Sequence, residues 1–163
     1  MKVIRHHIAD YLAPVAGSGS ETYALMGVGF SAMDEQPSAK VDKSAFINDT
    51  STSGTITGYE NKFAFDTQLI SDEVAIKQIY DIARNQKVGS DAEAFYVRVE
   101  LFDGEEGASA YPARRFKVAV EVSNINGAGT EIMKVTGTLH QVGNFEDGTF
   151  DIKTKTFTPK TAA

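Results

Sequence analysis

The three histidines are the first residues to test for catalysis or metal binding. His6 and His7 are adjacent, so in an extended segment their side chains point in opposite directions and do not form a metal pair. His140 lies in a strand-like segment on the same side as a lysine and two threonines, which indicates a surface or contact residue. No G-x-S-x-G nucleophile elbow supports a serine, histidine and aspartate triad. The chain has no cysteine, which excludes thiolate ligands, thiol nucleophiles and disulfides.

Two acidic turns and two pairs of glycines are the other candidates for ligand chemistry. The acids at 103–107 and 146–148 lack the spacing of a calcium loop, which needs roughly six or more oxygen ligands. The Gly-x-Gly fragments at 27–29 and 127–129 do not open a helix, so they do not place a phosphate on a helix N-terminus. A carboxylate pair could cleave glycosides, but no pair stands out, and tryptophan for sugar stacking is absent. The sequence therefore predicts no catalytic residue, no cofactor and no metal site.

Length and charge limit the class of protein. The 163 residues fit a single domain, 1–163, with ordinary apolar and charged fractions of 42% and 23%. The net charge is -6, whereas proteins that grip nucleic acid by its phosphates carry basic patches. No apolar run reaches the roughly 20 residues that span a bilayer, and His6, His7 and Asp10 interrupt any signal-peptide core. We therefore expect neither membrane insertion nor secretion.

One helix is predicted at about 71–88. Ser71 or Asp72 can cap its start, and Gly89 is a natural stop after its last turn. Its apolar residues recur with the helical period, which predicts that the helix lies on a sheet. The members of this stripe are Ala75, Ile76, Ile79, Tyr80 and Ala83.

Alternating apolar and polar residues predict strands along most of the remaining chain. We expect each late strand to pack one face on a core and to turn a mixed face to water or to a partner; in 94–103 the mixed face includes Tyr96 and Arg98. The expected fold is mainly β, α+β by count: a sandwich or barrel with one flanking helix and a long polar loop at about 31–55. The strands are expected at 21–30, 40–47, 55–66, 94–103, 114–123, 132–142 and 149–160. An N-terminal arm of about 1–20, which ends in a flexible GSGS joint, is expected before them, and a C-terminal tail of about 158–163 at the end.

Three stretches together point to a family. They are FINDTSTSGTITGYENKFAFDTQLISDEVAIKQIYDIARNQKVGSDAEAFYVRVELFD, then YPARRFKVAVEVSNINGAG, then VTGTLHQVGNFEDGTFDIKTKTFT. In this order and spacing the chain resembles the major tail (tail tube) proteins of phages that infect Gram-positive bacteria. Residues about 46–158 carry the resemblance.

The resemblance implies a structural virion protein without catalytic residues. Members of this family fold as a β-sandwich with a flanking helix and assemble into hexameric rings that stack as a hollow tail tube. The resemblance implies that the chain is made in the bacterial cytoplasm and ends in the virion. Its partners would be itself, a tape-measure protein, other tail proteins, and double-stranded DNA that passes through the lumen without specific binding.

The resemblance also assigns roles to two groups of residues. The long loop would reach the adjacent ring, and its candidate stacking residues are Asp34, Glu35, Lys40, Asp42, Lys43, Asn48 and Asp49. Carboxylates in the lumen would keep DNA phosphates from lodging there. The lumen-facing candidates are Glu60, Glu100 and Glu121.

Two other functions stay open from the sequence alone. A monomeric β-sandwich module that binds carbohydrate or protein would need an exposed aromatic platform, for which the candidates are Tyr23, Tyr96, Phe102 and Tyr111. A hydrolase would need a carboxylate pair, and the sequence indicates none in particular.

Overall fold

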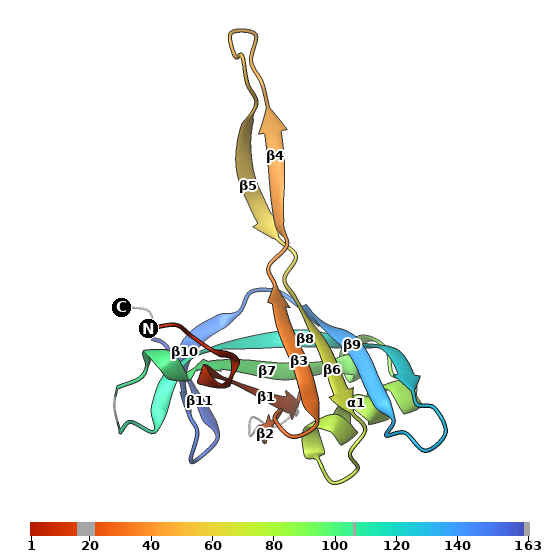
Figure 1. Ribbon diagram of the computed structural model, residues 1–163. Coiled ribbons are helices and arrows are strands. Elements are labelled where there is room, and N and C mark those ends of the chain that lie inside the picture. Colours follow the sequence, from red (N-terminus) through yellow and green to blue (C-terminus); the bar gives the residue numbers. More distant parts are fainter. Residues whose placement is uncertain (16–21, 106, 162–163) are drawn as a thin grey trace.

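The computed structural model describes residues 1–15, 22–105 and 107–161 (Figure 1). The GSGS joint and Glu106 of the acidic turn lie outside the described residues. The strands and the helix are β1 (Ile8–Pro14), β2 (Ala24–Leu25), β3 (Phe30–Gln36), β4 (Ala39–Ser44), β5 (Ser53–Tyr59), β6 (Lys62–Gln68), α1 (Val74–Arg84), β7 (Glu93–Glu100), β8 (Ala110–Asn126), β9 (Lys134–Gln141), β10 (Glu146–Asp151) and β11 (Thr156–Pro159). Short 3-10 turns, η1 (Arg5–His7), η2 (Gly89–Ala92) and η3 (Leu101–Asp103), lie between them.

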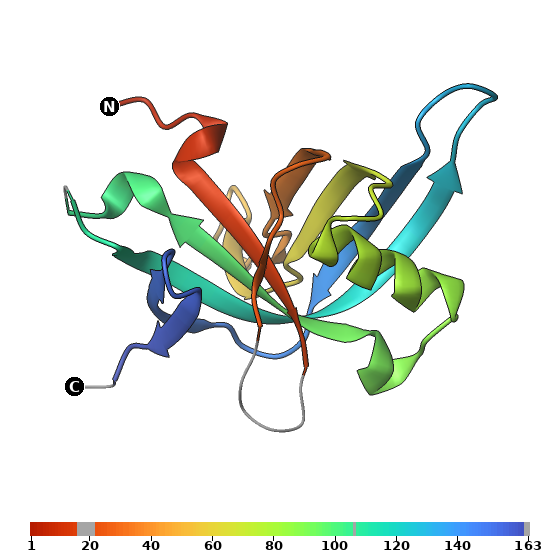
Figure 2. The same ribbon diagram turned by 90° about the horizontal axis from the view of Figure 1, so that it is seen from below.

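A single curled sheet forms the body of the molecule. Its strand order is β2-β1-β7-β8-β9-β6-β3, and β10 and β11 branch from β8. β8 spans 17 residues because, opposite the edge that pairs with β7, it pairs with two strands in turn: its first part with β10 and its second part with β9. The sheet bends into a half-barrel, and α1 lies at its open side (Figure 2). The mainly β, barrel-like fold with one helix is confirmed.

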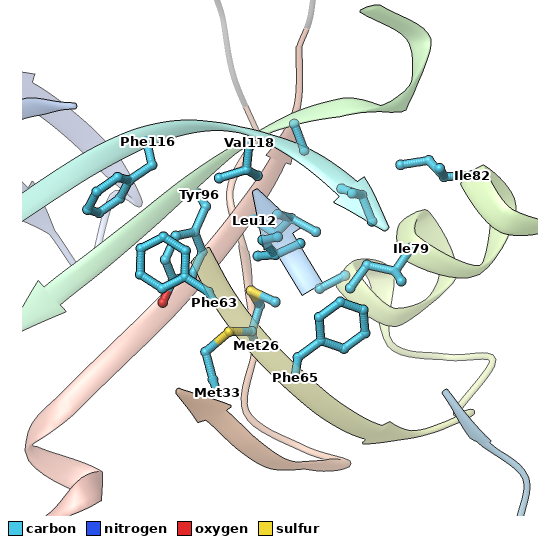
Figure 3. Packing of buried hydrophobic residues seen from close by; sticks show 14 of the residues in the cluster. Leu12, Met26, Met33, Phe63, Phe65, Ile79, Ile82, Tyr96, Phe116 and Val118 are labelled. Carbon is cyan, nitrogen blue, oxygen red and sulfur yellow. The ribbon is translucent and has the colours of Figure 1, made fainter. Parts of the chain in front are cut away.

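The main core fills the inside of this half-barrel (Figure 3). Alternate residues of β6, β7, β8 and β9 point inward, and Phe63 lies at their centre, with ring centroids 4.6 Å from Tyr96 and 4.9 Å from Phe116. Aromatic pairs at these distances add attraction beyond the area that they bury. Met26 and Met33 fill the space toward the open side.

The helix is confirmed, but it is shorter than predicted. It begins after Glu73, without a side-chain cap from Ser71 or Asp72. Gln86, at φ 50°, ends it instead of Gly89: the amides of Gln86 and Lys87 bond back to the carbonyls of Ala83 and Ile82, a Schellman closure. Of the predicted stripe, Tyr80 and Ala83 are only half-buried, and Ile82 takes their place beside the buried Ala75, Ile76 and Ile79.

A second core covers the other face of β1, β7 and the start of β8. The β10–β11 hairpin folds over this face and buries Phe150 and Phe157 against Tyr11 and Val97. β7 is therefore buried on both faces, and the expectation of a mixed, wet face for 94–103 is wrong for Tyr96 and Arg98. The hairpin covers the face of Val97, and the inside of the half-barrel buries Tyr96 and Arg98 on the opposite face. Alternation along one strand does not reveal that both of its faces are covered.

The expected strand at 149–160 is in fact a hairpin. The carboxylate of Asp151 accepts hydrogen bonds from the amides of Lys153, at 2.8 Å, and Thr154, at 3.1 Å, and so turns the chain. These bonds, that of Thr154 first, lower the pKa of Asp151. Lys155 completes the turn at φ 54°, and β11 returns antiparallel to β10.

The segment 31–55 is not a structureless loop. Its first residues form β3 at the edge of the main sheet, and its remainder enters a separate hairpin of β4 and β5. The predicted strand at 40–47 is confirmed in part as β4, whereas 55–66 breaks at Glu60 and Asn61 into β5 and β6. Only Ala24 and Leu25 of the predicted strand 21–30 form β2.

Both ends of the chain enter the sheet. Within the expected N-terminal arm, β1 pairs with β7 along its whole length, and Leu12 and Ala13 are fully buried. The expected C-terminal tail begins inside β11, and its last two residues, 162–163, lie outside the described residues.

Candidate assembly surface

The β4–β5 hairpin projects alone from the body of the molecule (Figure 1). Every residue of β4 is exposed, and so is every residue of β5 except one. At about 3.3 Å per residue it reaches roughly 20 Å. An isolated two-stranded hairpin is marginally stable at best in water, so a neighbour that packs against this hairpin would stabilise it.

One face of this hairpin is apolar because of a β-bulge. The register pairs Ala39 with Tyr59 and, after a shift between Lys40 and Val41, Val41 with Ile56. Cross-strand partners share a face, so the shift places Ile56 on the same face as Tyr59, although the two are an odd number of positions apart, which in a regular strand puts residues on opposite faces. Val41, Ile56 and Tyr59 are 54%, 57% and 64% exposed. We call these residues, with Ala39, the apolar hairpin face; within the described part of the chain nothing covers it.

An ion pair lies at the root of the hairpin. The Lys40 ammonium lies 2.6 Å from the Glu60 carboxylate, and both side chains are mostly exposed. The hydrogen bond from Lys40 and its charge lower the pKa of Glu60. The pair links the two strands at the base of the hairpin but adds little to the stability of the folded chain, because water screens it.

A second surface is the uncovered face of β3, β6, β9 and β8. The strand registers place Asp34, Ala64, Thr138 and Glu121 in one row across these four strands. Rows on either side carry small, polar or charged residues: Ala32, Gln36, Lys62, Asp66, Ala119, Asn124, Thr136 and His140. None of them is buried. We call this surface the polar sheet face.

An ion network crosses the inside of the half-barrel. Arg98 of β7 lies 3.8 Å from Asp10 of β1 and 3.8 Å from Glu35 of β3. Asp10 also accepts the Tyr96 hydroxyl and pairs with Arg5. β1 and β3 lie near opposite ends of the strand order, so the network ties the two margins of the sheet together.

The outer end of this network is a two-bond pair. Arg114 donates two hydrogen bonds of 2.9 Å to the two carboxylate oxygens of Glu35. Such bidentate pairs are among the stronger hydrogen-bonded contacts in proteins. Burial acts to raise the pKa of Glu35, but the hydrogen bond and charge of Arg114, with the charge of Arg98, outweigh it and lower that pKa.

This arrangement predicts a pH dependence. A carboxyl group with a lowered pKa stabilises the folded state above its unfolded value, here 4.5, and that contribution is lost as the pH falls through the folded pKa. The variant Glu35→Gln should therefore be less stable than the natural chain near neutral pH, and the difference should shrink below about pH 4. Urea unfolding of both chains across this range measures it; a difference that does not change with pH would contradict the prediction.

The geometry offers no catalytic arrangement among the described residues. The expectation that His6 and His7 point in opposite directions is wrong, because they lie in the 3-10 turn η1 and their ring centroids are 4.5 Å apart. His140 Nε2 lies 2.6 Å from Glu121 on the polar sheet face. No three metal-ligating side chains gather in the described part of the chain. None of its helices is long and apolar enough to cross a bilayer.

Comparison with known proteins places this geometry in a class. Profiles of known protein families do not match the chain, and neither does any curated protein sequence. Among solved structures, the SPP1 tail tube matches with a TM-score of 0.62 at 12% identity, over 92% of this chain and 80% of that one. This chain has the fold of a phage tail tube. The baseplate of the anti-feeding prophage, a structure refined with 6-fold symmetry, also matches, with a TM-score of 0.50 at 7% identity, over 94% of this chain and 98% of that one.

On the tail tube fold, the residues expected to stack rings do not form one surface. Lys40, Asp42 and Lys43 lie on β4, and Asn48 and Asp49 lie at the tip of the hairpin. The other two lie on β3 in the main sheet: Asp34 on the polar sheet face and Glu35 inside, bonded to Arg114. The sequence reasoning missed the apolar hairpin face, whose only signal was the apolar residues scattered through a polar stretch.

The residues expected to face a lumen are also spread out. Glu121 lies on the polar sheet face. Glu60 lies at the root of the hairpin, and Glu100 lies at the end of β7 opposite Ile8. Of the three, only Glu121 lies on the broad uncovered sheet.

The aromatic platform expected for a binding module does not form from the four candidates. Tyr23 and Tyr96 are buried in the two cores at 3% and 0% exposure, and Phe102 and Tyr111 are half-buried. The large exposed aromatic residues on the hairpin are Phe46 and Tyr59.

Proposed function

We propose that this protein is the subunit of a phage tail tube, in which hexameric rings of the chain stack into a hollow tube that conducts DNA to the host. The observation that carries the proposal is the bare β4–β5 hairpin with its uncovered apolar face, on a tail tube fold. An isolated subunit would leave this apolar face exposed to water, which is unfavourable, whereas a stacked neighbour would bury it.

The edges of the sheet support ring formation. Among the strands that the structure describes, β3 pairs with β6 alone, so its other edge is left open. β2 covers just two residues of β1 at the opposite margin. Exposed edges invite pairing with another chain, and closing a ring removes them. The 6-fold symmetry of the matched baseplate supports six copies in each ring.

The polar sheet face is the proposed lumen wall. Its small side chains leave a smooth surface, and Asp34, Asp66 and Glu121 give it acids to repel DNA phosphates. Glu60 and Glu100 would face the lumen only at its margins. These three acids outnumber Lys62 on the same face, so the face would repel DNA phosphates on balance. We assign the protein no catalytic role.

The other partners follow from this role. A tape-measure protein and other tail proteins would bind the tube, DNA would pass through its lumen without specific binding, and the subunit would be made in the host cytoplasm and end in the virion.

Electron microscopy of the concentrated protein tests the proposal. We expect rings with six-fold views and tubes that lengthen with protein concentration, and sedimentation should show the same growth. A chain that stays monomeric at every protein and salt concentration would refute the proposal.

A further inference from the structure

The loop at the tip of the hairpin, 45–52, carries the two large apolar side chains of the hairpin that are most exposed. Phe46 is 74% exposed and Ile47 is 102% exposed. The amide of Phe46 donates to the Asp49 carboxylate, and the amide of Asp49 donates to the Phe46 carbonyl, both at 2.9 Å. These two bonds hold the loop in one shape, so little conformational freedom would be lost on binding. We call Phe46 and Ile47 the hairpin tip.

An apolar groove lies at the opposite end of the molecule (Figure 1). The half-buried Leu69, Ile70 and Tyr80 line it between α1 and the loop before the helix. Its volume is about 320 Å³, at the lower end of the range for sites that enclose a small ligand. We call it the α1 groove.

The charges of the tip and the groove are complementary. Asp49 is the only charged residue of the loop 45–52. The rim of the α1 groove carries Lys77 and Arg84 against one acid, Asp81. A groove with a net positive rim is notable on a chain of net charge -6, and it suits an apolar segment that carries one carboxylate.

We propose that the hairpin tip of one copy inserts into the α1 groove of the next copy along the tube. This inference rests on the proposed function and names the two surfaces that meet when rings stack. The tip and the groove lie at opposite ends of the same chain, so each copy can give one contact and receive another. Such a head-to-tail contact repeats without closing and therefore builds a filament.

A second groove is the alternative acceptor. It lies between β1 and β3 and has a volume of about 610 Å³. Its lining includes the apolar Leu25 and Phe30 and the polar Ser31. β2 and the start of β3, which line this groove, lie at the same end of the molecule as α1 (Figure 1), so position alone does not decide between the two grooves. The charges favour the α1 groove: Arg5, the cation of the second groove, is already paired with Asp10, whereas Lys77 and Arg84 outnumber Asp81 around the α1 groove.

Cysteine crosslinking tests the contact, because the chain has no cysteine of its own. A double variant, Ile47→Cys with Ser71→Cys, places one thiol on the tip and one on the exposed rim of the α1 groove. Under mild oxidation we expect a ladder of covalent oligomers on a non-reducing gel. The matched control, Ile47→Cys with Ser31→Cys, places the second thiol in the alternative groove and should form at least about tenfold fewer links.

A second measurement removes the tip and keeps every other contact. In the variant Phe46→Ala with Ile47→Ala, the protein concentration needed for tubes should rise about a hundredfold, because two large apolar side chains are no longer buried. Thermal unfolding should be unchanged, since both side chains are exposed in the single chain.

The outcomes separate the two proposals. If tubes form but the variant with Ser71→Cys gives no covalent ladder, or if only the variant with Ser31→Cys gives one, the α1 groove is not the acceptor. The proposed tail tube function would still stand. A natural chain that forms no tubes at all overturns the proposed function and this inference with it.

Discussion

Replacing residues 37–60 with a single glycine should abolish tube formation and leave the body of the protein folded. Gln36 and Lys62 are cross-strand partners, so the new Gly-Asn61 pair would form a two-residue turn between β3 and β6. Asn61 is kept because its carbonyl accepts the Gln141 amide at 3.1 Å. The thermal midpoint should change little, whereas electron microscopy should show no tubes at concentrations at which the natural chain forms them.

Matched substitutions on a hairpin of unchanged length test whether assembly depends on its apolar face. Val41→Thr with Ile56→Thr makes the apolar hairpin face polar and keeps β-branched side chains, so we expect weaker assembly. Asp42→Asn with Thr55→Ser changes the next cross-strand pair, on the opposite face, and should leave assembly nearly intact.

Normal tubes from the chain in which glycine replaces residues 37–60 would show that the hairpin is not the stacking element.

Arg98→Ala should destabilise the folded chain by about 1–3 kcal/mol, because it removes a buried cation that lies between the carboxylates of Asp10 and Glu35. Arg98 is 8% exposed and Asp10 is 2% exposed, and Arg98 also lies 6.0 Å from the centroid of the Phe63 ring. Removal of the guanidinium would leave Asp10 with the Tyr96 hydroxyl and Arg5, and Glu35 with Arg114. The tie between β1 and β3 across the half-barrel would be lost.

Urea unfolding of the single chain, at concentrations below assembly, measures this loss. Lys40→Ala is the control, since it breaks an ion pair whose side chains are 58% and 69% exposed and should change the free energy of unfolding by less than about 1 kcal/mol. Equal effects of the two substitutions would mean that the internal network does not hold the sheet closed.

Local pattern predicted much of the fold correctly. The helical stripe located α1 because Ala75, Ile76 and Ile79 must share one face at that spacing. Alternation in 114–123 identified the buried residues of β8, Phe116, Val118 and Val120. Helix ends were less accurate, because Gln86 rather than a glycine adopted the left-handed conformation that closed α1.

The candidate assembly surface was predictable only in part. The sequence indicated that 31–55 was too long for a plain connection, and the resemblance gave it a role between rings. The bulge that places Ile56 and Tyr59 on one face depends on how β4 and β5 pair, and neither strand alone reveals that shift. The roles of Asp34 and Glu35 also changed once β3 joined the main sheet.

From its amino acids alone, this chain is an acidic, mainly β protein with one helix, with no thiol chemistry, and it resembles tail tube proteins. The periodicity of a segment reports which residues lie on the same side of a strand, and that information is local. Which side becomes buried depends on segments far away in the chain: the β10–β11 hairpin covers β7, and β3 brings Glu35 to Arg98 and Arg114. The tertiary structure therefore decided that Arg98 is an internal tie and that the β4–β5 hairpin stands uncovered, because burial is a property of neighbours in space.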